Sequence, residues 1–212
     1  MEEYQKIETL YKFDQATKSY LKEFYNPIVE YLAPLPWIAS EKFDGTNIRV
    51  HWDGHRVEWS GRTDASVLPK EVQETLAAAF GDSEVTFEQT FGEKDAILFM
   101  ECYGGKVQGG IYGGHERLIG FDVMVDGLYL NKAEAAELFP KFGIEPVEFF
   151  EVASLQEAVD IVKEGRLASH NEGDRPTRME GLVCVPKMRL FDGNGKRIAV
   201  KIKARDLAKV RE

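Results

Sequence analysis

The sequence of 212 residues contains little cysteine and no long apolar run. Its two cysteines, Cys102 and Cys184, are too few for a disulfide framework or a zinc site. No stretch of about 18 apolar residues is present, so no segment is expected to span a membrane. The first residues are acidic rather than apolar, so a secretory signal is not expected either. These features favour a cytoplasmic protein without membrane contact.

Positive charge is also scarce. The chain has 27 Lys and Arg against 36 Asp and Glu, which gives a net charge of −9. Indiscriminate binding of nucleic acid depends on a broad positive field, so this composition argues against it. A local basic pocket is still compatible with the balance, because cations gather near the C-terminus, at 187–189 and 196–211.

Two common signatures of nucleotide and metal sites are missing. The glycine-rich stretch at 104–114 is not followed by Lys-Ser or Lys-Thr, so it is not a P-loop. The histidines have no spacing typical of metal ligands; they are His51, His55, His115 and His170. A site for a nucleotide or a metal must therefore be sought elsewhere in the chain.

Hydrophobic periodicity and turn residues predict a mixture of strands and helices. Strands are expected at 36–42, 47–53, 55–61, 96–103, 117–125, 128–130, 179–186 and 197–203. Helices are expected at 69–80, shortly before Gly92, after Asn131, after Ser154 and near the C-terminus, with a helical or irregular segment at 1–35 and a loop at 166–178. Turns such as Asp53-Gly54 join most strands as hairpins, so the sheets should be mainly antiparallel. We expect one α+β domain over 1–212.

A lysine lies beside a turn in the stretch Glu41-Lys42-Phe43-Asp44-Gly45-Thr46-Asn47. Asp, Gly, Thr and Asn are unfavourable inside a helix, so the stretch predicts a strand end, a turn that holds Lys42, and a new strand from Asn47. A lysine fixed in this way loses rotamer freedom, and its ammonium can be aimed. By itself, however, a lysine before Asp-Gly is more often ordinary turn chemistry than a nucleophile.

Further along the chain, charged residues interrupt apolar strands. They are Glu101, Asp122, Glu180, Lys201 and Lys203. The last two alternate with apolar residues, so both should point to one face of a sheet. A buried charge without a partner is costly, so such residues usually face water or each other. An edge strand with one wet face explains any single case, but the set together with Lys42 favours a polar site.

Six short motifs in order resemble those of the covalent nucleotidyltransferases, the superfamily of ATP-dependent ligases and mRNA-capping enzymes. They are Lys42-Phe43-Asp44-Gly45-Thr46-Asn47, Ser60-Gly61-Arg62, Met100-Glu101-Cys102-Tyr103-Gly104, Phe121-Asp122-Val123, Glu180-Gly181-Leu182-Val183 and Val200-Lys201-Ile202-Lys203. DNA ligases and capping enzymes typically carry Arg where this chain has Asn47. In that respect the chain is similar to the nick-sealing RNA ligases of the RNA ligase 2 family.

The resemblance implies a nucleotidyltransferase (ATP-grasp-like ligase) fold of antiparallel sheets with flanking helices. No appended OB or C-terminal domain is expected, because the chain continues only nine residues past Lys203. The implied activity is that of an ATP-dependent RNA ligase, expected in RNA repair, with ATP and Mg²⁺ as cofactors. AMP would pass from Lys42 to an RNA 5′-phosphate, and a 3′-hydroxyl would then displace it. RNA with these ends is the expected partner, and a separate protein that supplies RNA affinity is a second candidate.

The resemblance also implies a role for each matched residue. Lys42 would be the nucleophile, and Lys201 and Lys203 would favour its neutral amine and offset phosphate charge. The implied nucleotide contacts are Glu41 at the adenine edge through its backbone, Asn47 near ribose and phosphate, Arg62 at a phosphate, Glu101 at the ribose, Phe121 on the adenine ring, and Glu180 at Mg²⁺. Phe121 as a core aromatic and Glu180 as a strand-end charge are open alternatives.

Three other functions stay open at this level. A minimal DNA ligase, or a capping-type enzyme that uses GTP, would share the motifs. A nucleic-acid-binding relative that has lost catalysis would share the fold, although the presence of every charged motif residue argues weakly against it. Separate incubations with labelled ATP and labelled GTP distinguish the capping enzyme from the ligases.

Overall fold

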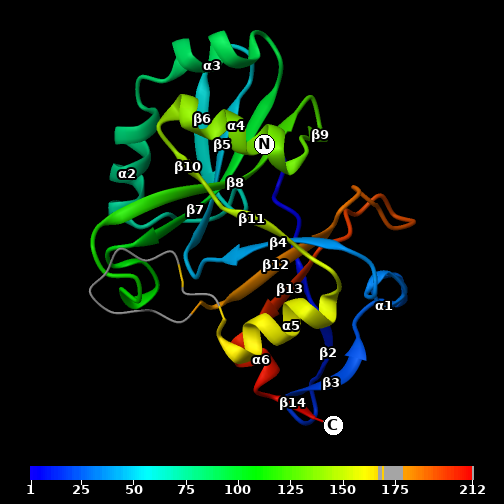
Figure 1. Ribbon diagram of the computed structural model, residues 1–212. Helices are drawn as coiled ribbons and strands as arrows, with labels where there is room; N and C mark the ends of the chain where they lie inside the picture. The colour runs from blue at the N-terminus through cyan, green and yellow to red at the C-terminus, as the bar shows by residue number, and fades with distance from the viewer. Residues whose placement is uncertain (167–168, 170–178, 212) are drawn as a thin grey trace. The chain divides into compact units, whose positions relative to one another are not determined.

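The computed structural model describes residues 1–166, 169 and 179–211. The chain divides into two compact units whose segments alternate along the sequence. Unit 1 consists of Met1–Tyr4 and Asp44–Val147, and unit 2 consists of Gln5–Phe43 and Glu148–Glu212. The strands of unit 1 form one sheet and those of unit 2 form two (Figure 1). Each unit has its own apolar core. The single domain expected over 1–212 stays a prediction.

Unit 1 is built on a six-stranded sheet in the order β10-β8-β7-β5-β6, with β9 paired to β8. Its strands are β5 (Thr46–Trp52), β6 (Val57–Gly61), β7 (Ala96–Gly104), β8 (Glu116–Val125), β9 (Leu128–Tyr129) and β10 (Glu145–Pro146). Its helices are α2 (Lys70–Phe80), α3 (Glu84–Phe91) and α4 (Lys132–Leu138), with 3₁₀ turns at Val107–Gly109 and Phe139–Phe142.

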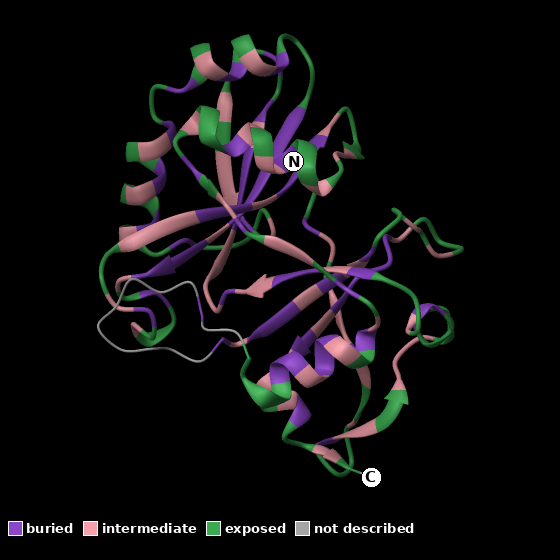
Figure 2. Cartoon of the chain, in the orientation of Figure 1, coloured by how far each residue is buried: buried purple, intermediate pink, exposed green. Residues whose placement is uncertain are grey.

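The helices of unit 1 pack on one face of this sheet. Ile48, Val50 and Trp52 alternate along β5 and belong to the same buried core as the apolar residues of α2 and α3. Figure 2 shows buried residues along the central strands and exposed residues on the outer sides of the helices. Since side chains alternate along a strand, Asn47 and Arg49 point to the other face of the sheet.

Unit 2 has a five-stranded sheet in the order β1-β13-β12-β4-β11 and a three-stranded sheet in the order β14-β3-β2. Its strands are β1 (Glu8–Thr9), β2 (Tyr11–Asp14), β3 (Ser19–Phe24), β4 (Trp37–Lys42), β11 (Phe149–Val152), β12 (Gly181–Pro186), β13 (Val200–Lys203) and β14 (Val210–Arg211). Its helices are α1 (Pro27–Leu32), α5 (Leu155–Glu164) and α6 (Ala204–Leu207). None of the described helices combines the length and the apolar composition needed to cross a membrane.

The larger sheet of unit 2 also has two different faces. Leu182, Val200 and Ile202 share a buried core with the apolar side of α5. Lys201 and Lys203 alternate with Val200 and Ile202 along β13 and therefore point to the opposite face. The alternation read from the sequence is confirmed here.

The predicted α+β class with mainly antiparallel sheets is confirmed. The β5–β6 and β7–β8 pairs are antiparallel, whereas β1–β13, β8–β10 and β3–β14 are short parallel pairs. The capping box predicted at Asn131 is present: its side chain accepts from the Glu134 amide, and the Glu134 carboxylate accepts from the Asn131 amide. Ser154 caps α5 in the same position.

The expectation for residues 1–35 needs correction, because only α1 is helical there and β1, β2 and β3 occupy much of the rest. The turn between β2 and β3 explains the difference. The Asp14 carboxylate accepts from the Ala16 amide at 2.9 Å and the Thr17 hydroxyl at 2.6 Å, and Lys18 has a φ of 52°. This turn reverses the chain inside a stretch whose apolar spacing resembles that of a helix.

Smaller differences occur elsewhere. The helix expected at the C-terminus ends at Leu207, and residues 210–211 form β14 instead. The strands β10 and β11 were not predicted, since they are short and lack a clear alternating pattern. Most of the loop expected at 166–178 lies outside the described residues.

Candidate active site

Lys42 ends β4 and contacts Glu180, the residue before β12. Its Nζ lies 2.8 Å from Glu180 Oε2 and also donates to the Phe43 carbonyl at 3.1 Å. The Lys42 side chain is 22% exposed, and that of Glu180 is 10% exposed. Two acceptors therefore orient the ammonium of Lys42, which does not extend freely into solvent.

Lys203 contacts the other oxygen of the same carboxylate, with 2.6 Å between its Nζ and Glu180 Oε1. Between the two lysines in the sheet stands Gly181, which pairs with Lys42 on one side and with Lys203 on the other. A Cβ atom at position 181 would lie 1.9 Å from the Ile202 carbonyl oxygen. Only glycine permits this close approach of β12 to β13.

Glu180 is therefore a carboxylate held between two ammonium groups. Burial by itself raises the pKa of Glu180, but the charge of Lys42 and the close contacts of Lys203 and Lys42 with the carboxylate outweigh it, so the pKa lies below its ordinary value. The group is ionised at neutral pH. Among the described residues there is no cluster of three or more His, Cys, Asp or Glu that could hold a metal ion. A role of Glu180 at Mg²⁺ stays a prediction.

Lys201 lies on the same face of β13 as Lys203. Within the described parts of the chain its ammonium makes no hydrogen bond or ion pair. Burial, followed by the charges of Lys203 and Lys42, holds the pKa of Lys201 below its ordinary value. The three ammonium groups of Lys42, Lys201 and Lys203 act on one another and outnumber the carboxylates that act on them, Glu180 and Glu8, so the excess of positive charge suits an anionic ligand.

Glu41 differs from its neighbour Lys42 in direction. Its side chain points to the other face of β4, where its carboxylate accepts a hydrogen bond from the Ser169 hydroxyl. The pairing of β4 with β11 runs only as far as Ser40, while Glu41 pairs with Leu182 of β12. The predicted contact of the Glu41 backbone with adenine stays a prediction.

In unit 1, Asn47 and Glu101 are directly opposite each other on β5 and β7. Both lie on the face of the sheet away from α2 and α3. Asn47 Oδ1 is buried and has no hydrogen-bond partner among the described residues. An unsatisfied buried acceptor costs about 1 to 3 kcal/mol, so this oxygen is suited to a hydroxyl or amine of a bound ligand.

The Asp44-Gly45 turn is held by three side chains of unit 1. Glu101 Oε1 accepts from the Gly45 amide at 3.2 Å, the Tyr112 hydroxyl accepts from the Asp44 amide at 2.8 Å, and Gln108 donates to the Gly45 carbonyl at 3.1 Å. A Cβ atom on Gly45 would lie 2.3 Å from the Cys102 carbonyl oxygen, so glycine is required. No contact was predicted for Tyr112 or Gln108, which lie within the glycine-rich stretch at 104–114.

Phe121 is the extra residue of a β-bulge. Gly120 pairs with Met100 and Asp122 with Phe99, so Phe121 has no opposite residue. Its half-buried ring packs edge-on against Tyr4, with 5.1 Å between the ring centroids. Bulges often redirect a side chain next to a functional site. The position is compatible with stacking on a base and does not place Phe121 in the buried core of unit 1.

Asp122, the next residue, serves a structural role. Its side chain is fully buried and accepts hydrogen bonds from the Tyr4 hydroxyl at 2.7 Å and from Lys132 Nζ at 2.6 Å. Lys132 also donates to the Phe121 carbonyl at 2.9 Å. The charge that interrupts this strand is therefore balanced inside unit 1.

Arg62 follows the last residue of β6 and is exposed. In the described part of the structure its guanidinium has no hydrogen bond and no ion pair. It is thus available for an anion such as a phosphate, which matches the planar fork of Arg donors.

Comparison with known proteins shows which family this chain belongs to. The RNA ligase family model matches residues 35–203, well over half of the chain. The chain belongs to the RNA ligase family. No curated protein sequence matches it. The family predicted from the motifs is therefore confirmed.

Solved structures of a Naegleria gruberi RNA ligase have a similar fold. The structure with PPi aligns with a TM-score of 0.63 at 16% identity and covers 95% of this chain and 60% of that chain. A mutant with ATP and Mn aligns with a TM-score of 0.61 at 15% identity, covering 93% and 59%. A mutant with AMP and Mn aligns with a TM-score of 0.62 at 14% identity and covers 95% of this chain and 60% of that chain. The chain thus spans about three fifths of the length of that ligase.

Within this RNA ligase family member, the predicted site residues fall into two sets. Unit 2 holds Glu41, Lys42, Glu180, Lys201 and Lys203, and unit 1 holds Asn47, Arg62, Glu101 and Phe121. The structure brings Lys42 and Lys203 together at Glu180, and it pairs Asn47 with Glu101. The role of each residue stays a prediction.

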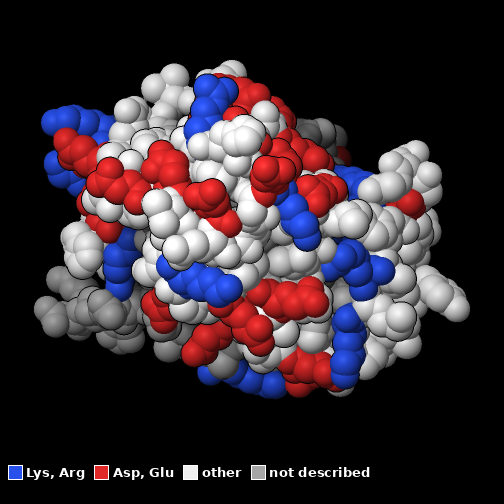
Figure 3. Space-filling model, turned by 90° about the horizontal axis from the view of Figure 1, so that it is seen from above, with Lys and Arg blue, Asp and Glu red and all other residues white. Residues whose placement is uncertain are grey.

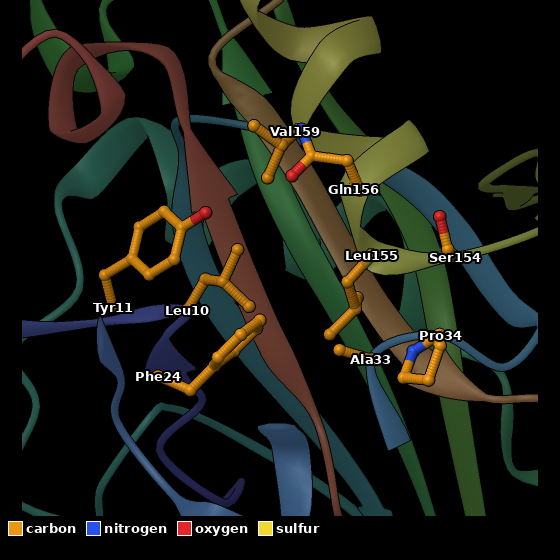
Figure 4. A pocket seen from close by; sticks show the side chains of 9 residues that line it. All are labelled: Leu10, Tyr11, Phe24, Ala33, Pro34, Ser154, Leu155, Gln156 and Val159. Atoms are coloured by element: carbon orange, nitrogen blue, oxygen red, sulfur yellow. The ribbon is translucent and has the colours of Figure 1, made fainter. Parts of the chain in front are cut away.

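A separate hollow in this RNA ligase family member has a volume of about 340 Å³ and lies within unit 2. It is lined by Leu10, Tyr11, Phe24, Ala33, Pro34, Ser154, Leu155, Gln156 and Val159 (Figure 4). None of these side chains is charged, and none belongs to the predicted site. The lining supplies no positive charge to offset that of a triphosphate, so this hollow is unsuited to one.

Proposed function

We propose that this chain is an ATP-dependent RNA ligase that first transfers AMP from ATP to Lys42. One arrangement carries the proposal: the Lys42 ammonium is fixed on Glu180, with Lys203 on the other carboxylate oxygen and the unpartnered Lys201 on the same face. This arrangement combines an aimed amine with positive charge for a phosphate. Membership of the RNA ligase family supports the same activity.

In the first step the nitrogen of Lys42 forms a bond to the α-phosphorus of ATP. The bond from that phosphorus to the oxygen of pyrophosphate breaks. The nitrogen releases two protons to solvent in all, one when the ammonium becomes the neutral amine that attacks and one after the new bond has formed. Because its lowered pKa makes Glu180 a weak base, we propose that Glu180 orients the amine and does not accept its proton. Lys201 and Lys203 offset the charge that develops on the phosphoryl oxygens.

The residues of unit 1 supply the proposed contacts to the nucleoside. Asn47, with its unsatisfied oxygen, and Glu101 beside it are suited to ribose hydroxyls. Phe121 offers a half-buried ring for the base, and Arg62 offers a free guanidinium for a phosphate. The chain passes from unit 2 to unit 1 directly after Phe43. Asn47, the first of these contacts, therefore follows the proposed nucleophile Lys42 by only five residues.

Mg²⁺ or Mn²⁺ would screen the charge of the triphosphate. The described residues contain no dedicated cage of metal ligands, and both oxygens of Glu180 are already held by lysines. This would fit an ion held mainly by phosphate oxygens and water, as Mg²⁺ often is in phosphoryl-transfer enzymes, with Glu180 reaching it through a bound water.

The later steps act on RNA with a 5′-phosphate and a 3′-hydroxyl. AMP moves from Lys42 to the 5′-phosphate, and the 3′-hydroxyl then displaces it to form the phosphodiester. The net charge of −9 gives little general attraction for RNA. On the face in Figure 3, acidic and basic side chains are interspersed. We therefore propose that a separate partner adds RNA affinity, in a cytoplasmic repair setting.

Intact mass spectrometry after incubation with ATP and Mg²⁺ tests the proposal. We expect the mass of one AMP to be added by an acid-labile, alkali-stable bond, and Lys42→Ala to abolish it. Lys70→Ala, which changes an exposed lysine of α2, should label normally. Labelling of Lys42→Ala would refute the nucleophile. Labelling by GTP in preference to ATP would indicate a capping-type enzyme, and preferential sealing of a DNA nick would indicate a DNA ligase.

A further inference from the structure

Arg49 is a fully buried arginine in the middle of β5. All of its nitrogens donate hydrogen bonds: Nε to the Gly61 carbonyl at 2.7 Å, Nη1 to the Met1 and Glu2 carbonyls at 3.1 and 2.9 Å, and Nη2 to Ser60 Oγ at 3.3 Å and Asp64 Oδ1 at 2.8 Å. A buried guanidinium is costly unless its donors are satisfied, and here five contacts satisfy them. The proposed nucleotide contacts do not include Arg49.

Three of these five contacts lie in the turn on either side of Arg62. Ser60 and Gly61 precede it, and Asp64 follows it by two residues. The turn has its own bonds as well: Ser60 Oγ donates to the Thr63 carbonyl at 3.0 Å, and the Thr63 amide donates to Ser66 Oγ at 3.1 Å. Hydrogen bonds from the buried Arg49 thus fix the backbone around Arg62, while the Arg62 side chain is exposed and makes no hydrogen bond within the described residues.

The fork of Arg49 suits this task better than a lysine would. Its planar donors reach the carbonyl before Arg62 and the carboxylate after it at the same time, whereas an ammonium has no such geometry. The Asp64 side chain is 69% exposed although its partner is completely buried, and the hydrogen bond from Arg49 holds the pKa of Asp64 below its ordinary value. The pair therefore joins the interior of unit 1 to its surface turn.

We infer that Arg49 is a positioning residue for Arg62, which it holds in place for a phosphate of the nucleotide or of the RNA end. This inference rests on the proposed function. The alternative is that Arg49 only stabilises the fold by binding the N-terminal residues. In that case a change at Asp64 would lower stability but would not alter the binding of phosphate by Arg62.

A double-mutant cycle between Asp64 and Arg62 separates the two readings. Asp64→Asn keeps an acceptor but loses the charge paired with Arg49, so it is mild enough to fold. We expect it to raise KM about twofold to fivefold, with kcat less affected, in whichever step Arg62→Ala impairs, adenylylation or AMP transfer to RNA. In the Arg62→Ala background the same change should have no further effect. Arg49→Lys should raise the same KM about tenfold or more, and it should likewise have no further effect in the Arg62→Ala background.

Glu58→Gln is the matched control, because Glu58 is an exposed carboxylate on β6 that pairs with Arg56, another exposed residue. Its kinetics should equal those of the wild type. A second readout needs no activity: trypsin should cleave after Arg62 faster in Asp64→Asn and Arg49→Lys than in Glu58→Gln. Equal cleavage, additive effects in the cycle, or no impairment by Arg62→Ala would each overturn the inference. Failure of the wild type to take up AMP would instead refute the proposed function, on which the inference depends.

Discussion

Lys42 and Lys203 stand opposite the same residue, Gly181, on the two sides of β12. Their side chains meet the two oxygens of one carboxylate, that of Glu180, at 2.8 and 2.6 Å. A glycine in the central strand is what allows this, because the backbone of β13 lies where a Cβ would be. The sheet therefore fixes the spacing between the expected nucleophile and one of its cationic neighbours.

Gly181→Ala should damage this arrangement without changing any charge. The new methyl group would lie 1.9 Å from the Ile202 carbonyl oxygen, so β13 has to move and carry Lys201 and Lys203 with it. We expect a loss of unfolding free energy of about 1 to 3 kcal/mol and a marked fall in the rate of AMP uptake. Denaturant unfolding and intact mass measure the two. Gly193→Ala is the control, since nothing lies within 4 Å of its Cβ; an equal effect there would contradict the argument.

Glu180→Gln should lower stability in a pH-dependent way. The folded-state pKa of Glu180 lies below its ordinary value of 4.5, so its charge stabilises the fold above that pH, and the contribution is lost as the pH falls through the folded-state pKa. We expect the variant to lose about 1 to 3 kcal/mol at neutral pH and to approach the wild type in acid. Urea unfolding at both pH values checks this. Glu151→Gln, which changes a half-exposed ion pair with Lys187, should show little difference at either pH.

Much of this site could be read from the sequence because its residues interrupt regular patterns. Lys201 and Lys203 alternate with core residues of β13, and Lys42 directly precedes an Asp-Gly turn. These local patterns predicted which face each side chain occupies. The capping box at Asn131 was predictable for the same reason, since its partners are three residues apart.

Contacts between distant segments could not be predicted in this way. Arg49 binds carbonyls more than forty residues away, at Met1 and Glu2, and in the sequence it is one polar residue in an alternating strand. The bulge at Phe121 and the short strand β11 depend on pairing with partners far along the chain. The hairpin of β2 and β3 lies in a segment predicted to be helical or irregular, because its apolar residues have helical spacing.

Lys201→Arg should change how nucleotide binding depends on pH. The pKa of Lys201 lies below its ordinary value of 10.5, so this lysine loses its charge at a lower pH than a free lysine, whereas an arginine stays charged. We expect the affinity of the wild type for ATP to weaken in the alkaline range below 10.5, and that of Lys201→Arg to weaken less. Calorimetric titration without divalent metal, which prevents turnover, measures this. Lys196→Arg, at a half-exposed lysine paired with Glu8, should follow the wild type; identical slopes in all three proteins would exclude Lys201 from the phosphate site.

Glu101→Ala and Glu101→Gln should separate two functions of one carboxylate. The glutamine keeps a carbonyl oxygen that can accept from the Gly45 amide, while the alanine cannot. We expect Glu101→Ala to depress AMP uptake about tenfold or more and to loosen the Asp44-Gly45 turn, and Glu101→Gln to keep the turn but bind ATP less tightly. Hydrogen exchange at Gly45 and the KM for ATP report on the two effects. Normal kinetics in both variants would leave Glu101 with a structural role alone.

Joining of RNA ends should be far more sensitive to salt than AMP uptake. Uptake depends on the ammonium cluster and its half-buried neighbours, which salt screens weakly, whereas RNA binding depends on exposed contacts in a chain of net charge −9. Each phosphate contact also contributes affinity through counterion release, so weak contacts fail first as salt rises. We expect efficient AMP uptake at low and moderate salt, with joining of 5′-phosphorylated RNA only at low salt.

Sealing of a pre-adenylylated RNA should need no ATP, because only the final displacement remains. Joining of both substrates is measured at the two salt concentrations, with a DNA nick as control. Tight sealing of RNA that salt does not weaken would show a substrate surface on this chain that its charge does not predict.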